Sequence, residues 1–247
     1  GGGGGGGLGY RNNYSVTPGQ QLAAYVGYGG NGGTSSGNNN AWYGGQSYIY
    51  YGTNICYAAG GVKGSYNVTS GYGTAANGGT DYAYNDGGGR GGQPANGSSG
   101  NGSGGGSGAG GYSGNGGVGG RYNSNPTAGA GGGGGGGGSV NGWTAAVTAK
   151  GGGVALFGQG ADGAASASNN TQGNLTTQGY RGSEANSTTI KSGEYGGGGC
   201  GCEDDSGGAA APGNRGAIRI MWGVDRAFPS TNADEANDEG NTTTISV

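Results

Sequence analysis

The sharpest chemical cluster in this sequence is a pair of cysteines, Cys200 and Cys202, separated by one glycine and followed by three acids at 203–205. Thiolates suit soft metal ions and carboxylates suit hard ones, so the mixture fits neither class well. A disulfide across a single intervening residue would close a strained ring. Cys56 is distant in sequence and could pair with either of the others. We expect reduced, partly buried thiols here and no metal site.

Catalytic chemistry has few candidate residues in this chain. Histidine is absent, which excludes Ser-His and Cys-His nucleophile systems and any zinc site with an imidazole ligand. Paired carboxylates for glycoside hydrolysis are still available. The candidates are Asp81, Asp86, Asp162, Glu184, Glu194 and the cluster Glu203, Asp204 and Asp205. Their spacing singles out no pair, so we interpret them as loop acids and predict a protein that is not an enzyme and uses no cofactor.

Tyrosine offers recognition chemistry, and the chain has 17 of them. Rigid aromatic rings among small polar residues form adaptable contact surfaces, and their flat faces can stack on sugars or apolar patches. The alternative is that each ring covers the edge of a glycine segment. We take as candidate receptor-binding residues the five tyrosines that lie among Gly, Asn, Ser and other polar residues: Tyr82, Tyr84, Tyr112, Tyr122 and Tyr180.

The elements that position these side chains must be built largely from glycine, which supplies 75 of the 247 residues. Charged residues make up 9% and hydrophobic residues 30%, so an ordinary apolar core cannot hold the whole chain. Such a composition is typical of disordered, low-complexity chains. However, 17 tyrosines and three tryptophans are far too many for a solvating linker. The sequence therefore indicates an ordered fold that is stabilised by something other than a large apolar core.

Glycine runs recur at 1–7, 87–89, 104–106, 131–138, 151–153 and 196–199. A glycine run is poor in an α-helix and weak in a strand, but it can form a left-handed extended helix with about three residues per turn. Such helices have no internal hydrogen bonds, and they can bond sideways only where no Cβ intervenes. From 102 to 120 every third residue is glycine. We predict a bundle of polyglycine II helices, with Gly131, Gly134 and Gly138 as structural positions.

The remaining sequence predicts short strands and almost no α-helix. Strand-forming residues are frequent from 14 to 62, and "GAIRIMWG" at 216–223 alternates, with Ile218, Ile220 and Trp222 on one face and Arg219 and Met221 on the other. We therefore predict an irregular, glycine-rich, mainly β fold. Its glycine-rich domain spans 1–223, with strands around 14–62, a glycine-helix bundle around 87–211 and a closing strand at 216–223. Residues 224–247 are expected to form an acidic tail.

Two segments resemble the glycine-rich domains of tail-fibre and adhesin proteins of tailed bacteriophages. They are "GGGGGGGLGYRNNYSVTPGQ" at the start and "GAIRIMWGVDRAFPSTN" near the end, the latter containing Gly216 to Gly223 and Arg226 to Thr231. The resemblance implies a virion structural protein at a fibre tip that contacts a polysaccharide or outer-membrane protein of a bacterial host. It also implies other virion proteins as partners and a homo-oligomer, with a trimer as the usual form, although no heptad stem is visible.

Other partner classes find no support in the sequence. Ten basic residues against thirteen acidic ones give no electrostatic footprint for nucleic acid, and no apolar run approaches the roughly 18 residues needed to span a membrane. The resemblance to phage fibre proteins implies a protein of the virion or another extracellular setting. Two alternatives remain: a purely structural fibre, capsid-decoration or filament subunit, and an ice-binding protein, against which the bulky scattered tyrosines argue.

Overall fold

The computed structural model describes residues 2–31, 42–64, 75–95, 104–121, 124–138, 150–156, 158–166, 195–199, 201, 211–223, 226–229 and, for their backbone, 242–246. Three strands, β1 (Ala23–Tyr25), β2 (Ser47–Tyr51) and β3 (Thr53–Ala58), form one antiparallel sheet in that order. A second antiparallel pair joins β4 (Ala217–Met221) to β5 (Thr242–Ser246). Within the described residues the only helical turn is a 3-10 turn, η2 (Gly79–Asp81). The expectation of a mainly non-helical chain is confirmed.

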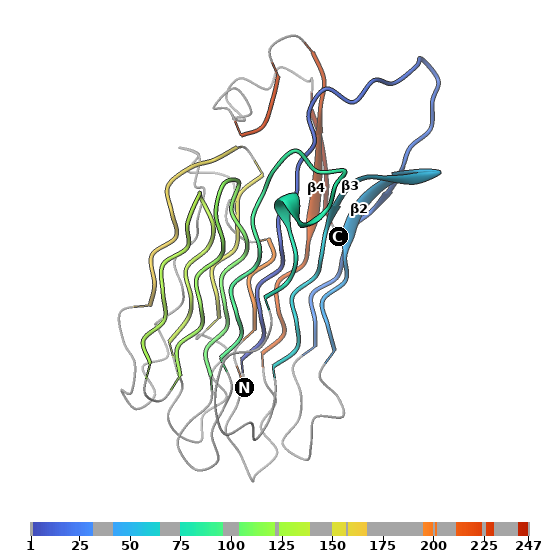
Figure 1. Cartoon of the computed structure of the whole chain (residues 1–247). Coiled ribbons are helices and arrows are strands. Elements are labelled where there is room, and N and C mark those ends of the chain that lie inside the picture. The colour runs from blue at the N-terminus through green and yellow to red at the C-terminus, as the bar shows by residue number, and fades with distance from the viewer. Residues whose placement is uncertain are drawn as a thin grey trace.

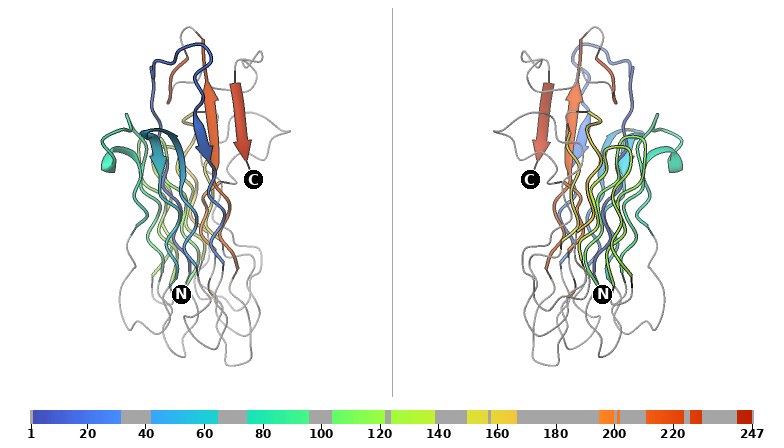
Figure 2. Two further views of the ribbon diagram at one scale, coloured as in Figure 1. Left: turned by 90° about the vertical axis from the view of Figure 1, so that its right-hand side faces the viewer. Right: turned by 90° about the vertical axis from the view of Figure 1, so that its left-hand side faces the viewer.

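Most described residues outside the strands belong to extended, glycine-rich segments that run side by side along the long axis of the molecule (Figure 1). The strands lie at the end remote from Gly2. Turned by 90°, the same segments form a narrow body, with β4 and β5 on one side of it (Figure 2). We call this set of segments the glycine bundle. It includes the first glycine run and so extends beyond the 87–211 range expected from the sequence.

Hydrogen bonds between the segments of the glycine bundle repeat every third residue. The first run shows this, since its backbone N–H groups donate in turn to three different segments. Gly3 and Gly6 donate to the carbonyls of Gly199 and Gly196, respectively (both 2.6 Å). Gly4 and Gly7 donate to those of Val62 and Ala59 (2.8 and 3.0 Å). Gly2 and Leu8 donate to those of Ala95 and Gly89 (both 2.9 Å). In the first two pairs the partner number falls by three as the donor number rises by three, and in the third it falls by six as the donor number rises by six. The neighbours are therefore antiparallel to the run and are arranged around it.

The predicted three-residue phase of glycines appears directly in the pairing of segments 104–111 and 114–120. Gly105, Gly108 and Gly111 donate to the carbonyls of Gly120, Gly117 and Gly114, each at 2.8 Å. The same spacing joins segment 114–120 to the next segment, because Gly117 and Gly120 donate to the carbonyls of Gly134 and Gly137, again at 2.8 Å. Glycines of one phase thus face each other across neighbouring segments.

The segments approach so closely that most bundle glycines have no room for a side chain. A Cβ built at Gly134 would overlap the carbonyl oxygen of Gly152, and one built at Gly5 would overlap that of Gly108. Gly6 is different: the nearest atoms to its added Cβ lie at 3.5 Å or more, which is ordinary van der Waals contact. The requirement for glycine is therefore set position by position, according to which way each residue faces.

The free edge of β3 is covered by a side chain instead of a fourth strand. Asn85 is 8% exposed, and its amide bonds both backbone groups of Tyr57: Oδ1 accepts from the N–H (3.0 Å) and Nδ2 donates to the C=O (2.8 Å). Nδ2 also donates to the carbonyl of Gly79 at 2.9 Å. Asn85 therefore supplies the pair of bonds that a neighbouring strand would supply, and it closes an edge open to further pairing.

The predicted two-faced pattern of the closing strand is wrong in part. Ile218 is buried as expected, but Arg219 is equally buried at 8% exposed, and its guanidinium donates to the carbonyl of Leu156 at 3.2 Å. Trp222 is 49% exposed because the strand ends at Met221, before this residue. The pairing of β4 with β5 also places a strand in the segment expected to be a tail.

A small apolar cluster closes the upper end of the glycine bundle. Leu8, Ala109, Tyr112 and Val154 are buried together, with Tyr10 and Phe228 packed against them. The Tyr112 and Phe228 rings stack with their centroids 5.6 Å apart. Asn12 holds the backbone of Phe228 from both sides, donating to its C=O (2.7 Å) and accepting from its N–H (2.9 Å). The motif Arg226 to Thr231 thus ties the end of the chain to its beginning through Phe228.

Candidate functional site

Five tyrosine rings form a continuous row across the three-stranded sheet and the adjacent turn. We call them the tyrosine row: Tyr25, Tyr48, Tyr57, Tyr82 and Tyr84. Strand register produces the first part, because Tyr25 pairs with Tyr48 and Tyr48 pairs with Tyr57 on neighbouring strands. The centroid distances are 4.6 Å and 6.0 Å, with both pairs stacked. Cross-strand aromatic pairs of this kind stabilise a sheet and fix the rings.

The row continues onto the segment that follows η2. The Tyr57 and Tyr82 centroids are 4.6 Å apart, and the Tyr82 and Tyr84 rings stack at 5.7 Å. The Tyr57 hydroxyl donates to Oε1 of Gln46. Partial burial, together with the neighbouring tyrosines, raises the pKa of Tyr57 above its usual value. The row therefore presents ring edges and hydroxyl groups to solvent, while the faces of its inner rings are covered by their neighbours.

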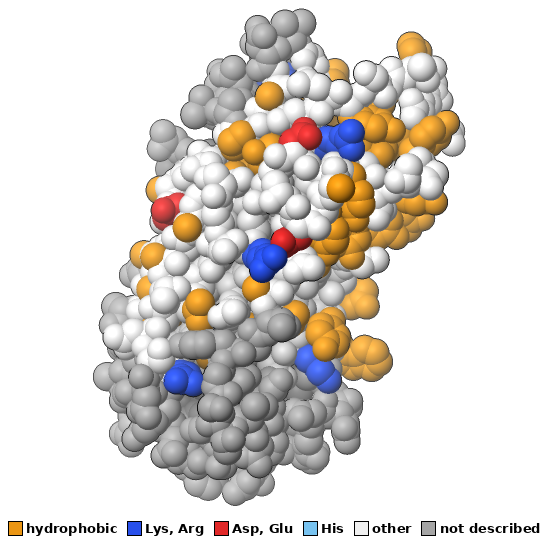
Figure 3. Space-filling model, viewed as in Figure 1, with side chains coloured by type: hydrophobic (Ala, Val, Ile, Leu, Met, Phe, Trp, Pro, Cys, Tyr) orange, Lys and Arg blue, Asp and Glu red, His pale blue; other side chains and the backbone are white. Residues whose placement is uncertain are grey.

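Open aromatic faces lie beside the row, at the edge of the glycine bundle. We call Tyr28, Trp42 and Tyr43 the edge aromatics; they are 68%, 64% and 58% exposed. They come from segments 27–31 and 42–46, which pair through Gly45 to Tyr28 (2.8 Å) and Trp42 to Asn31 (3.3 Å). In Figure 3 hydrophobic side chains gather over the sheet and along this edge, whereas much of the described bundle surface is white, the colour of backbone and of uncharged polar side chains.

The structure brings together two of the five predicted receptor-binding tyrosines, Tyr82 and Tyr84, in the tyrosine row. The prediction for Tyr112 is wrong, because this residue is 3% exposed and belongs to the apolar cluster. Its hydroxyl donates to the carbonyl of Ala155 (2.9 Å) and accepts from the N–H of Gly158 (3.2 Å). Its neighbours in sequence are small and polar, which concealed the long-range packing. Tyr122 and Tyr180 lie outside the described residues.

The sequence interpretation missed Tyr25, Tyr48 and Tyr57 as surface residues. Their spacing along two strands is compatible with either face of the sheet, and only the strand register shows that they align. The exposed Tyr28 and Trp42 were also missed, since nothing local distinguishes an exposed ring from a buried one in a glycine-rich segment.

Three of the candidate acids accept hydrogen bonds from backbone or side-chain groups. Asp81 binds Arg90 through both oxygens, at 2.6 to 3.1 Å, and this hydrogen bonding holds the pKa of Asp81 below its usual value. Asp86 accepts from the N–H of Asn12 (2.6 Å), and Asp162 from that of Gly132 (2.7 Å). Glu184, Glu194 and the acids at 203–205 lie outside the described residues. Among the residues that are described, no group of three His, Cys, Asp or Glu side chains could hold a metal ion.

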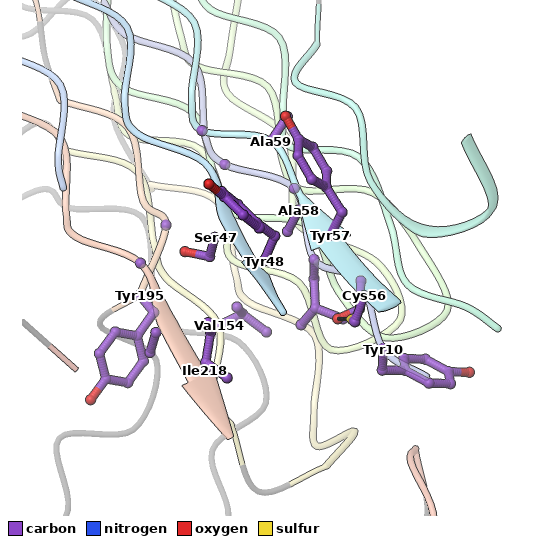
Figure 4. A pocket seen from close by; sticks show the side chains of 18 of the residues that line it. Tyr10, Ser47, Tyr48, Cys56, Tyr57, Ala58, Ala59, Val154, Tyr195 and Ile218 are labelled. Carbon is purple, nitrogen blue, oxygen red and sulfur yellow. Dashed lines mark hydrogen bonds between the residues drawn. The ribbon is translucent and has the colours of Figure 1, made fainter. Parts of the chain in front are cut away.

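A cavity of about 710 Å³ lies between the inner face of the sheet, β4 and the glycine bundle. Figure 4 shows Val154, Tyr195 and Ile218 across from Ser47 and Cys56 on the strands. Its upper wall is aliphatic, with Leu22, Ile49, Ile55, Val154, Ile218 and Ile220, and its lower wall is largely glycine backbone. Tyr28, Asn31, Trp42 and Lys63 also line it, so the cavity extends to the edge aromatics. Cavities of this volume accommodate small molecules.

Cys56 carries a free thiol, which donates to the carbonyl of Gly9 at 3.4 Å. Burial is the main cause that raises the pKa of this thiol to about 12. The expectation of a reduced, partly buried Cys56 agrees with this environment, while Cys200 and Cys202 lie outside the described residues. Because the thiolate is the reactive form, the raised pKa disfavours reaction of Cys56 at neutral pH.

We expect stability to fall at alkaline pH, because the folded state holds the Cys56 proton more tightly than the unfolded state does. This contribution is fully present below the unfolded pKa of about 8.5 and is lost as pH rises towards 12. The expected slope for this group is up to about 1.4 kcal/mol per pH unit. Guanidinium unfolding of the native chain and Cys56→Ala at several pH values measures it. Identical slopes for the two proteins would contradict the assignment.

Comparison with protein-family models, with curated proteins and with solved structures finds no match to this chain. Within its described part, none of the helical structure is long and apolar enough to cross a membrane.

Proposed function

We propose that the glycine bundle consists of polyglycine II helices. Three observations support this: the hydrogen bonds to each neighbour recur every third residue, they connect different segments, and a Cβ fits at few bundle positions. A helix with three residues per turn directs successive N–H groups about 120° apart, towards three neighbours in turn. Each bond contributes about 0.5–1.5 kcal/mol, so the many lateral bonds take the place of a large apolar core.

We further propose that the chain is a non-catalytic virion protein, a tail-fibre tip or adhesin domain that contacts a bacterial surface. The main support for this proposal is the aromatic surface formed by the tyrosine row and the edge aromatics. These rings lie on segments that are joined to their neighbours by backbone hydrogen bonds. A contiguous patch of exposed apolar side chains commonly marks an interaction site. A rigid scaffold lowers the entropy lost when a partner binds them.

The motifs that resemble phage fibre proteins have structural roles consistent with this proposal. Residues 217–221 form β4, and Phe228 completes the apolar cluster with Tyr10 and Tyr112. These segments therefore close the domain, which leaves its aromatic surface for recognition. The expected partners are a polysaccharide or outer-membrane protein of the host, other virion proteins and further copies of the chain.

Immunogold electron microscopy of intact particles, with antibody raised against this chain, tests the location. We expect gold at fibre tips, because an adhesin must be presented at the distal end. Gold along whole fibres or on the capsid would instead assign the chain a purely structural role. Label on free filaments would mean that the chain is not part of the virion.

A further inference from the structure

The edge aromatics have a geometry that differs from that of the tyrosine row. Within the described part of the chain, Tyr28 and Trp42 form no ring contact, so neither loses a face to a neighbouring ring. The Tyr28 ring lies close over Gly45: its Cδ1 would be 3.2 Å from a Cβ added there. This atom of the ring therefore lies near the backbone of Gly45, while the side chain as a whole is 68% exposed. Most of the Tyr28 ring is accessible to a ligand.

Tyr28 and Trp42 belong to one strip of surface. They lie on paired antiparallel segments, where Tyr28 is opposite Gly45 and Asn31 is opposite Trp42. Tyr28 and Asn31 are three residues apart, as are Trp42 and Gly45. With the three-residue turn proposed above, each pair projects from one side of its segment. Between Tyr28 and Asn31 the first segment has only glycines, Gly29 and Gly30, which carry no side chain.

Polar groups surround the strip where the cavity reaches it. Asn31 and Lys63 line the cavity together with Tyr28 and Trp42. Lys63 is held on the adjacent segment, which accepts a bond from Gly44 to Gly61 at 2.9 Å, and its amine lies 5.8 Å from the centre of the Tyr43 ring. The strip therefore combines exposed aromatic rings, one amide group and one cation where the cavity reaches the surface.

We propose that this strip binds a polysaccharide, with sugar rings stacked on Tyr28 and Trp42. The C–H face of a sugar carries partial positive charge and complements the negative face of an aromatic ring. Sugar hydroxyls at the ring edge would bond to Asn31, Lys63 and the glycine backbone. This inference rests on the proposed adhesin function and selects polysaccharide over protein as the receptor class.

The composition of the exposed surface favours this choice. Among the described residues, nine large hydrophobic side chains are exposed, and eight of them are aromatic, Val16 being the exception. The strip also carries polar side chains, since Asn31 and Lys63 line the cavity together with Tyr28 and Trp42. A sugar ring offers the complementary combination, a flat C–H face bordered by hydroxyl groups.

The test is binding of the full chain, fluorescently labelled, to an array of purified neutral glucans, N-acetylhexosamine polymers and acidic capsular polysaccharides. We expect at least one polymer to bind. Tyr28→Ala and Trp42→Ala should weaken that binding by about tenfold or more, the equivalent of about 1.4 kcal/mol. Tyr28→Phe and Trp42→Phe keep the ring face and should stay near the native affinity. Tyr14→Ala, at a partly exposed tyrosine outside the strip, is the matched control.

Equal binding by the alanine variants and the native chain, or no binding to any polymer, would overturn the proposal. Melting temperatures of all variants establish that each is folded. The immunogold experiment separates the two proposals. Label at fibre tips without polysaccharide binding would leave the adhesin role and remove the sugar site. Polysaccharide binding by a chain that is not located at fibre tips would leave the sugar site and remove the adhesin role.

Discussion

Replacing Gly134 with valine is expected to prevent folding altogether. The residue is buried in the glycine bundle, and its own N–H donates to Ala109 at 3.0 Å while its C=O accepts from Gly117 at 2.8 Å. The added Cβ would overlap the carbonyl group of Gly152, which is backbone and cannot rotate away. Relief requires that two segments separate, and this breaks several lateral bonds worth about 1 kcal/mol each. Circular dichroism, melting and solubility of the purified variant measure the result.

The matched control lies in the first glycine run. Gly6 is also buried, but a Cβ there meets its nearest atoms only at ordinary contact distance. Gly6→Ala should therefore fold, whereas Gly5→Ala, one residue earlier, should not, because its Cβ would overlap Gly108. Similar melting temperatures for Gly5→Ala, Gly134→Val and the native chain would contradict the packed bundle. This comparison separates steric exclusion from a general loss of glycine flexibility.

Asn85→Ala is expected to produce the second largest loss of stability, about 3 kcal/mol. The variant removes three hydrogen bonds and leaves the N–H and C=O of Tyr57 without their partner at a partly buried edge, whereas the C=O of Gly79 keeps its bond from the N–H of Tyr82. Each unpaired buried group costs about 1–3 kcal/mol. The exposed edge of β3 should also promote self-association. Chemical unfolding and analytical ultracentrifugation measure the two effects.

Asn115→Ala is the control for that experiment. Asn115 is exposed, and its side-chain Oδ1 accepts a bond from the backbone N–H of Arg90 at 3.0 Å. Its loss should change the free energy of unfolding by less than about 1 kcal/mol. A comparable loss for the two alanine variants would mean that Asn85 is not a strand substitute.

The parts of this fold that could be predicted from sequence are those set by residue type alone. Glycine runs exclude α-helix, and strand formers mark 47–58 and 217–221. The glycine phase from 102 to 120 indicated a three-residue repeat, and the bonds between 104–111 and 114–120 have that spacing. Which runs become neighbours could not be predicted, because one glycine run is chemically the same as another. The position of residues 2–8 among three segments depends on long-range packing alone.

The candidate site was predicted less completely than the fold. Tyr82 and Tyr84 were found because they stand beside turn residues, but Tyr112 has a similar local sequence and is buried. The roles of Asn85 and Asn12 have no local signal, since each side chain bonds backbone that is 28 and 216 residues away. Whether a side chain in this protein is buried depends on which glycine segment packs against it. The residues next to it in the sequence give no indication of that.

The glycine bundle also has a thermal consequence. The heat-capacity change of unfolding increases with exposed apolar area and decreases with exposed polar area. A domain held together mainly by backbone hydrogen bonds exposes much peptide and little hydrocarbon when it unfolds. Its heat-capacity change per residue should therefore lie below the usual value of about 12–15 cal/mol/K. The stability curve is then flat, and the domain keeps much of its stability in cold water, where apolar cores weaken.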